Sequence, residues 1–222
     1  GDLLGALIGA RDPETGQGLS EAELVDNTLT FIAAGHETTT GALTWALYLI
    51  ANDPPTQARL LEEARAAYGD GPAGAEGLER LVFHDQVLQE AMRLFPPAAI
   101  ISRRAARDIE VGPVRMRKGD DVNCMIYVMH RSSLLWERPA AFDPERFTPE
   151  RRKARHRFAH MPFGGGPRVC IGARFAMNEA VVMLATLVRR LAFEPRPGAP
   201  PLPRVRATLR PAGGMPLVLR PR

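Results

Sequence analysis

The strongest chemical signal in the sequence is a cysteine near the end of a glycine-rich run, PFGGGPRVCIG, at residues 162–172. The glycines at 164–166 allow positive φ angles and let the main chain approach a flat ligand closely. Arg168 lies two residues before Cys170 and offers a cation to a carboxylate on such a ligand. A helix is predicted to begin directly after the run, and its first N–H groups favour a thiolate over a thiol. Taken alone, the run fits a ligating thiolate, a catalytic cysteine or a structural turn.

A second group of chemically active side chains lies in the segment AGHETT, residues 34–39. Thr38 can donate a hydrogen bond to the carbonyl of Ala34, four residues earlier, and such a bond bends or opens a helix. Glu37 is an acid that can deliver protons through the opening. His36 and Glu37 also begin the zinc-hydrolase pattern H-E-x-x-H, but position 40 is threonine, which excludes that class of site.

A third feature is an acid and a base three residues apart in QEAMRLFPP, residues 89–97. Glu90 and Arg93 share one face of a predicted helix and can pair there, as in many surface helices. Together with the two segments above and PERF at 144–147, this E-x-x-R pair resembles the cytochrome P450 family of haem-thiolate monooxygenases. The four motifs occur in the family's order and cover almost all of residues 20–222. The resemblance implies a mainly α fold with a small β component, and the C-terminal half of a soluble bacterial member.

The resemblance also implies a role for each motif residue. Cys170 is expected to ligate the iron of haem b. The other expected haem-binding positions are Gly35, Arg103, Phe163, Gly164, Gly166, Arg168 and Gly172, with Arg104 as an alternative to Arg103. Glu37 and Thr38 are the expected catalytic residues, which supply protons where dioxygen binds. Glu90, Arg93 and Arg146 are expected to fix the fold around the haem without taking part in the chemical step.

The implied function is an oxidoreductase that inserts one atom of O2 into an apolar organic substrate. The apolar segments at 98–101 and 213–215 match pocket-lining regions of the family and indicate the apolar substrate. Electrons are expected from a separate ferredoxin or flavodoxin with its reductase, because the chain carries no dinucleotide, flavin or ferredoxin-type motif. A peroxygenase or isomerase is the alternative enzyme, which Glu37 and Thr38 disfavour. A truncated, inactive haem-binding fragment is the other alternative, since the family's N-terminal half is expected to be missing and residues 1–222 alone to be inactive.

The elements that must position these residues follow from periodicity and capping. Ser20 and Glu23 form an S-x-x-E capping box ahead of an apolar periodic run. No linker separates two cores, so one domain over residues 1–222 is predicted. Its expected parts are a long helix at 20–52, a helix at 55–68, the E-x-x-R helix at 83–95, a small β region at 98–130, the PERF and cysteine segments at 139–172, a helix at 173–192 and a C-terminal β region at 193–222.

The composition is that of an ordinary soluble protein, with 45% hydrophobic and 24% charged residues among 222. No apolar run is long enough to cross a bilayer, and two cysteines predict reduced thiols and a cytoplasmic location. An N-terminal membrane anchor would precede residue 1. The net charge is +4, and the one dense basic cluster, RRKARHR at 151–157, has no interleaved aromatic side chains. This cluster predicts a solvated loop or a docking site for an acidic partner, and no nucleic-acid binding.

Overall fold

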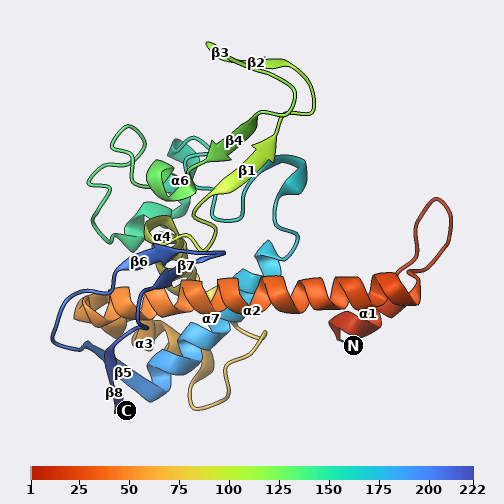
Figure 1. The fold of residues 1–222 in the computed structure, drawn as a ribbon. Helices are drawn as coiled ribbons and strands as arrows, with labels where there is room; N and C mark the ends of the chain where they lie inside the picture. The colour runs from red at the N-terminus through yellow and green to blue at the C-terminus, as the bar shows by residue number, and fades with distance from the viewer. Residues whose placement is uncertain (1) are drawn as a thin grey trace. The chain divides into compact units, whose positions relative to one another are not determined.

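The structure is a computed structural model that describes residues 2–222. The chain divides into two compact units, one that ends at Thr38 and one that spans Thr39–Arg222. Helix α2, Glu21–Ala51, contributes to both units, and its bounds agree with the prediction. Figure 1 shows the elements in chain order.

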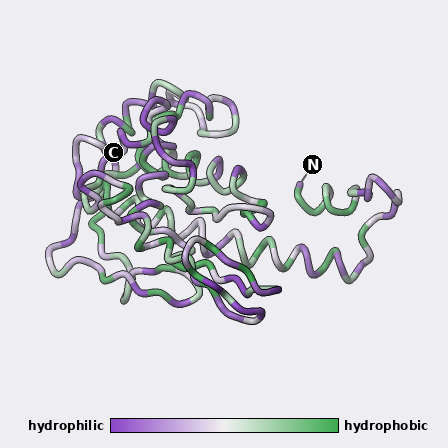
Figure 2. Tube along the Cα trace, turned by 90° about the horizontal axis from the view of Figure 1, so that it is seen from above, coloured by the Kyte–Doolittle hydropathy of each residue, from purple (hydrophilic) through white to green (hydrophobic). Residues whose placement is uncertain are grey.

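The first unit contains α1, Leu3–Gly9, and the N-terminal part of α2. Figure 2 colours most of α1 as hydrophobic, although the side chains of Leu3, Leu4 and Ile8 are exposed. The predicted capping box at the start of α2 is confirmed. Ser20 donates its N–H to Glu23 Oε2 at 2.8 Å, and Glu23 donates its own N–H to Ser20 Oγ at 3.3 Å. These reciprocal bonds satisfy donors that a helix start leaves unpaired.

The core of the second unit forms where α2 ends and three further helices pack together. These are α3 (Pro54–Tyr68), α4 (Val82–Leu94) and α7 (Ala173–Arg190), all within two residues of their predicted ends. Asp53 accepts the N–H of Thr56 at 3.1 Å, and prolines occupy the first turn of α3, so that helix begins sharply. The fully buried side chains of the cluster include Ile50, Leu60, Val87, Leu88, Leu184 and Val188.

The β component consists of four separate antiparallel pairs rather than one sheet. In the predicted region at 98–130, β1 (Ile101–Arg104) pairs with β4 (Asp121–Cys124), and β2 (Ile109–Val111) pairs with β3 (Val114–Met116). At the C-terminus, β5 (Leu191–Pro195) pairs with β8 (Leu217–Pro221), and β6 (Pro203–Val205) pairs with β7 (Leu209–Pro211). Short helical segments complete the unit: η1 (Leu78–Arg80), α5 (Ile126–Met129), η2 (Pro144–Phe147), α6 (Pro149–Ala154) and η3 (Gly166–Arg168).

The start of α4, the helix that carries Glu90 and Arg93, is held by an acid from α3. Glu63 accepts the N–H groups of Phe83 at 2.8 Å and His84 at 3.0 Å, and its Oε2 lies 2.6 Å from Nδ1 of the buried His84. Burial acts to raise the pKa of Glu63, but these hydrogen bonds to its ionised form outweigh burial and lower the pKa. Glu63 therefore fastens α4 to α3 as a carboxylate.

We expect Glu63→Gln to lower the free energy of unfolding by about 1–3 kcal/mol at pH 7, because three donors lose an ionised acceptor. Since the pKa of Glu63 lies below its ordinary 4.5 in the folded chain, this stability is present above pH 4.5. It is lost as the pH falls through the lowered value. Denaturant unfolding at several pH values should show the gap between parent and variant closing below pH 4.5. Glu62→Gln, at the exposed neighbouring position, is the control, and an equal loss in that variant would contradict the assignment.

Candidate functional site

The cysteine run folds as a loop that closes on itself just before α7. Cys170 donates its N–H to the carbonyl of Phe163 at 2.9 Å, and Gly164 donates its own to the carbonyl of Met161 at 3.1 Å. A single turn of 3-10 helix, η3, lies within the loop. These two main-chain hydrogen bonds hold the loop on both sides, at Met161–Gly164 and at Cys170.

Two glycines of the loop have conformations that other residues rarely adopt. Gly164 has φ 76° and Gly166 has φ 73°, both in the left-handed region. A Cβ atom on Gly164 would also lie 3.3 Å from Cδ1 of Ile101, so the loop packs closely against β1 there. The φ angle therefore favours glycine at 164, and the approach of Ile101 leaves little room for a side chain there.

The outer face of the loop is open and apolar. The thiol of Cys170 is exposed, and so are the large side chains of Ile171 (88%) and Phe175 (71%) beside it. Within residues 2–222, Arg168 forms no ion pair with a carboxylate. A soft ligand, apolar surface and an unpaired cation thus occur together on one short segment.

Strand β1 places Arg103 and Arg104 in different surroundings. Arg104 is held by Asp121 across the strand pair, with Nε–Oδ1 at 2.8 Å and Nη2–Oδ2 at 3.0 Å. Arg103 pairs with no carboxylate in the described chain, and its Nη1 donates only to the carbonyl of Ser102. Because side chains alternate along a strand, Arg103 points to the same face as Ile101, which contacts the cysteine loop. The geometry favours Arg103 as the cation that serves the loop.

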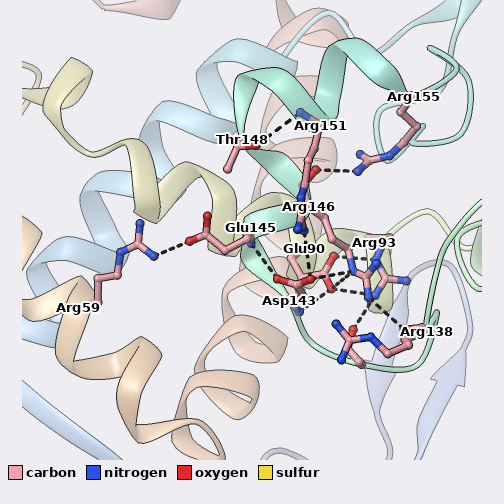
Figure 3. Close-up of polar contacts among 11 residues, drawn as sticks. Arg59, Glu90, Arg93, Arg138, Asp143, Glu145, Arg146, Thr148, Arg151 and Arg155 are labelled. Carbon is pink, nitrogen blue, oxygen red and sulfur yellow. Dashed lines mark hydrogen bonds and ion pairs between the residues drawn. The ribbon is translucent and has the colours of Figure 1, made fainter.

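The E-x-x-R pair is completely buried and is joined by Asp143 and by Arg146 of the PERF segment (Figure 3). Arg93 donates Nε to Glu90 Oε2 at 2.6 Å and Nη2 to Oε1 at 2.8 Å, a two-pronged contact. Asp143 donates its N–H to Oε1 at 2.9 Å. Arg146 is looser, with Nε 3.4 Å from Oε1 and Nη2 bonded to the carbonyl of Arg138 at 3.0 Å. Burial raises the pKa of Glu90, and Arg93 chiefly opposes that rise.

Sequence reasoning missed the aromatic and basic groups that pack around this pair. Arg155 donates to the carbonyl of Arg146 at 2.6 Å and lies over the ring of Trp136 at 4.0 Å, and the ring of His160 lies beside Phe147. Burial lowers the pKa of Arg155 to about 10. No spacing pattern announces these contacts. The one available signal was a histidine, a tryptophan and an arginine in segments that otherwise read as loops.

The residues of AGHETT lie in the unit that ends at Thr38, apart from Thr39. The predicted bond from Thr38 Oγ1 to the carbonyl of Ala34 is confirmed at 2.7 Å. It does not open the helix, since α2 is α-helical from end to end, and Thr30 makes the same bond to Asp26 at 2.7 Å. Glu37 and Thr38 are half-buried, and a Cβ on Gly35 would meet no atom within 4 Å.

Comparison with known proteins decides the family. A family model described as "Cytochrome P450" matches residues 1–217. The chain belongs to the cytochrome P450 family. The P450 chain is 40% identical to cyclooctatin synthase of Streptomyces melanosporofaciens. The match covers 100% of this chain and 48% of that protein. It is 38% identical to cytokinin hydroxylase of Arabidopsis thaliana, over 99% of this chain and 43% of that protein. It thus spans about half the length of the curated relatives it matches.

Solved structures agree with the predicted mainly α fold with small sheets. The crystal structure of the cytochrome P450DA heme domain matches with a TM-score of 0.94 at 34% identity, over 100% of this chain and 50% of that one. No helix within residues 2–222 is both long and apolar enough to cross a membrane.

The family implies a haem cofactor, and the residues around Cys170 fit one. A haem presents an apolar ring with ionised carboxylates at its edge. The loop offers an exposed sulfur and apolar side chains, and Arg103 and Arg168 are cations that no carboxylate of residues 2–222 neutralises. Gly164 and Gly166, which adopt positive φ angles, also leave the loop main chain without side chains at those positions.

Proposed function

We propose that the P450 chain belongs to a monooxygenase that inserts one atom of O2 into an apolar organic molecule, with Cys170 as the thiolate ligand of haem b. The observation that carries the proposal is the exposed Cys170 on a glycine loop that also carries the unpaired Arg168 and packs against β1, the strand of the unpaired Arg103, in a chain of this family. The hydroxylase name of one relative supports an oxygen-inserting reaction.

Each loop residue has one task in this proposal. Cys170 supplies the sulfur, just ahead of the first turn of α7. Arg103 and Arg168 neutralise the propionates, while Phe163, Gly164, Gly166 and Gly172 shape the main chain that faces the ring. Gly35 leaves space on α2. A haem bound through a thiolate supplies the reductive activation of O2.

Glu37 and Thr38 handle protons in this proposal. The Glu37 carboxyl can pass on a proton, and the Thr38 hydroxyl can both donate and accept a hydrogen bond beside it. Thr38 must release the carbonyl of Ala34 or share its proton to do so, because that carbonyl holds its hydrogen in the resting helix. Proton supply at one defined hydroxyl favours an oxygen-inserting reaction over an isomerisation, which consumes no protons.

The partners in this proposal follow from the reaction. A separate ferredoxin or flavodoxin with its reductase supplies two electrons. The substrate is a small apolar molecule, because Ala98, Ala99, Ile100 and Ile101 form an apolar segment after α4. That segment is fixed in place: Leu209 donates its N–H to the carbonyl of Pro97 at 2.9 Å, and Tyr127 donates its own to the carbonyl of Ala99 at 3.1 Å.

We expect Thr38→Ala to leave haem loading and reduction unchanged and to cut product formed per electron pair by roughly 10-fold, with hydrogen peroxide released instead. The measurement is product and peroxide against reductant consumed, with a ferredoxin and its reductase as donor. Thr30→Ala is the matched control, since Thr30 makes the same 2.7 Å bond within α2, to the carbonyl of Asp26. Unchanged coupling in Thr38→Ala would remove its proton role. Turnover with peroxide but none with the donor would favour a peroxygenase.

A further inference from the structure

A buried histidine contacts the main chain just before the cysteine loop. His130 follows α5 and has a fully buried side chain (0% exposed). Its Nε2 lies 2.8 Å from the N–H of Met161. A main-chain N–H can only donate, so Nε2 must carry a lone pair, and the ring proton resides on Nδ1. The main-chain carbonyls of Met92 and Arg93 lie where they favour that proton, although neither forms a well-aligned bond with Nδ1.

The same histidine connects the buried ion pair to the loop that carries Cys170. Arg93 Nη1 donates to the carbonyl of His130 at 2.8 Å, and the His130 ring holds Met161. The carbonyl of Met161 in turn accepts the N–H of Gly164, which lies just after Phe163, the partner of Cys170. Three successive contacts therefore join α4 to the cysteine loop, and the middle one depends on an imidazole lone pair.

A second histidine lies against the first. The ring of His160 stacks on that of His130 with centroids 5.0 Å apart and planes at 28°. The residue is partly exposed, yet its Nε2 is buried without a hydrogen-bond partner among the described residues. His160 also lies edge-on to Trp136 and Phe147. The stack thus sets the His130 ring against the His160 ring, which is itself packed against Trp136 and Phe147.

The surroundings of the pair disfavour positive charge on either ring. Burial lowers the pKa of His130 from 6.5 to about 4, and Arg93 on α4 and the adjacent Arg131 add to the effect. Burial also lowers the pKa of His160, helped by His130 and by Arg155 and Arg152 from the segment before it. Glu90, an acid on α4, is already paired with Arg93.

We propose that His130 is a positioning residue for the proximal loop, and that as a neutral imidazole it holds the main chain at Met161, from which the loop to Cys170 begins. A proton on Nε2 of His130 occupies the lone pair that accepts the Met161 N–H. Two N–H donors would then face each other, so protonation requires this hydrogen bond to open. Burial lowers the pKa of His130 while the contact is formed, and an opening that exposes the ring to water returns the pKa toward 6.5. The equilibrium constant for opening the His130–Met161 contact therefore rises as the pH falls below 6.5 and becomes constant below about 4.

The test is hydrogen exchange of the Met161 amide against pH in the complete gene product loaded with haem. After correction for intrinsic exchange, the opening constant should rise roughly 100-fold between pH 6.5 and 4. His130→Gln places an amide oxygen near the position of Nε2 and cannot take up a proton, so its profile should be nearly flat. The amide of Phe193, which donates to Gln57 Oε1 at 2.8 Å, reports global unfolding. His156→Gln is the matched control, because His156 is exposed and its Nδ1 accepts the N–H of Phe158 at 3.3 Å.

Three results would overturn the proposal. The Met161 opening constant could stay constant with pH in the parent, or the opening constants of Met161 and Phe193 could rise together. The third is a pH dependence of Met161 opening in His130→Gln that equals that of the parent. The parent profile decides the matter if His130→Gln fails to load haem. The ferrous–CO spectrum followed over the same pH range should lose its thiolate signature in parallel with Met161 opening. Only this spectroscopic measurement rests on the proposed role of Cys170. If the parent lacks the thiolate signature at pH 7, the assignment of Cys170 as iron ligand is refuted, and the proposal for His130 is not.

Discussion

Arg93→Lys is expected to lower the free energy of unfolding by about 3–5 kcal/mol and to abolish haem retention. Arg93 uses all five of its N–H groups. Two bind Glu90, two bind the carbonyls of His130 and Pro139, and one binds the carbonyl of Ala141 at 3.0 Å. A lysine keeps the charge but has three donors at a single point, so buried carbonyls and part of Glu90 lose their partners. Domains have only about 5–15 kcal/mol of net stability, so this loss is a large share.

The matched control is Arg59→Lys. Arg59 also pairs with a glutamate, Glu145, but its side chain is 54% exposed, and such pairs contribute about 0–1 kcal/mol. Denaturant unfolding and the ratio of haem to protein absorbance should separate the two variants clearly. If Arg93→Lys costs no more than Arg59→Lys, the buried network does not hold the region together.

Local elements of this fold could be predicted from the sequence because their causes are local. Ser20 and Glu23 fixed the start of α2 through bonds that span only three residues. The boundary between the helices predicted at 20–52 and 55–68 also has a local cause, since Asp53 caps α3 and prolines occupy its first turn. The division of the predicted β region into separate pairs was missed, because strand pairing between 101–104 and 121–124 depends on contacts across intervening turns.

The contacts of the candidate site were harder to predict than its residue types. Motif spacing singled out Glu90 and Arg93, but three of the five acceptors of Arg93 are main-chain carbonyls 37 to 48 residues away. A carbonyl carries no sequence signature, so nothing in the motif pointed to residues 130–141. The choice between Arg103 and Arg104 likewise needed the strand register that places Asp121 opposite Arg104.

Cys170→Ser is expected to abolish the thiolate signature of the bound haem, with the largest spectroscopic effect of any single change in the chain. The loop would still close, because the bond between the Cys170 N–H and the carbonyl of Phe163 involves only main-chain atoms. A serine hydroxyl is a hard, weakly acidic group that stays protonated where the thiol ionises, so it cannot replace the electron-rich sulfur.

The second cysteine provides a demanding control. Cys124 lies on β4 directly opposite Ile101, whose side chain contacts Gly164, so it is the other thiol in the neighbourhood of the loop. It is half-buried, however, whereas Cys170 is exposed. Cys124→Ser changes one atom at a comparable place and should leave the iron ligand untouched.

The decisive measurement is the ferrous–CO absorbance spectrum of the haem-loaded gene product and of these two variants. We expect the red-shifted Soret band of a thiolate-ligated haem in the parent and in Cys124→Ser, and its loss in Cys170→Ser with the main-chain fold retained by circular dichroism. Persistence of that band in Cys170→Ser, or its loss in Cys124→Ser alone, would contradict the assignment of Cys170 as the iron ligand.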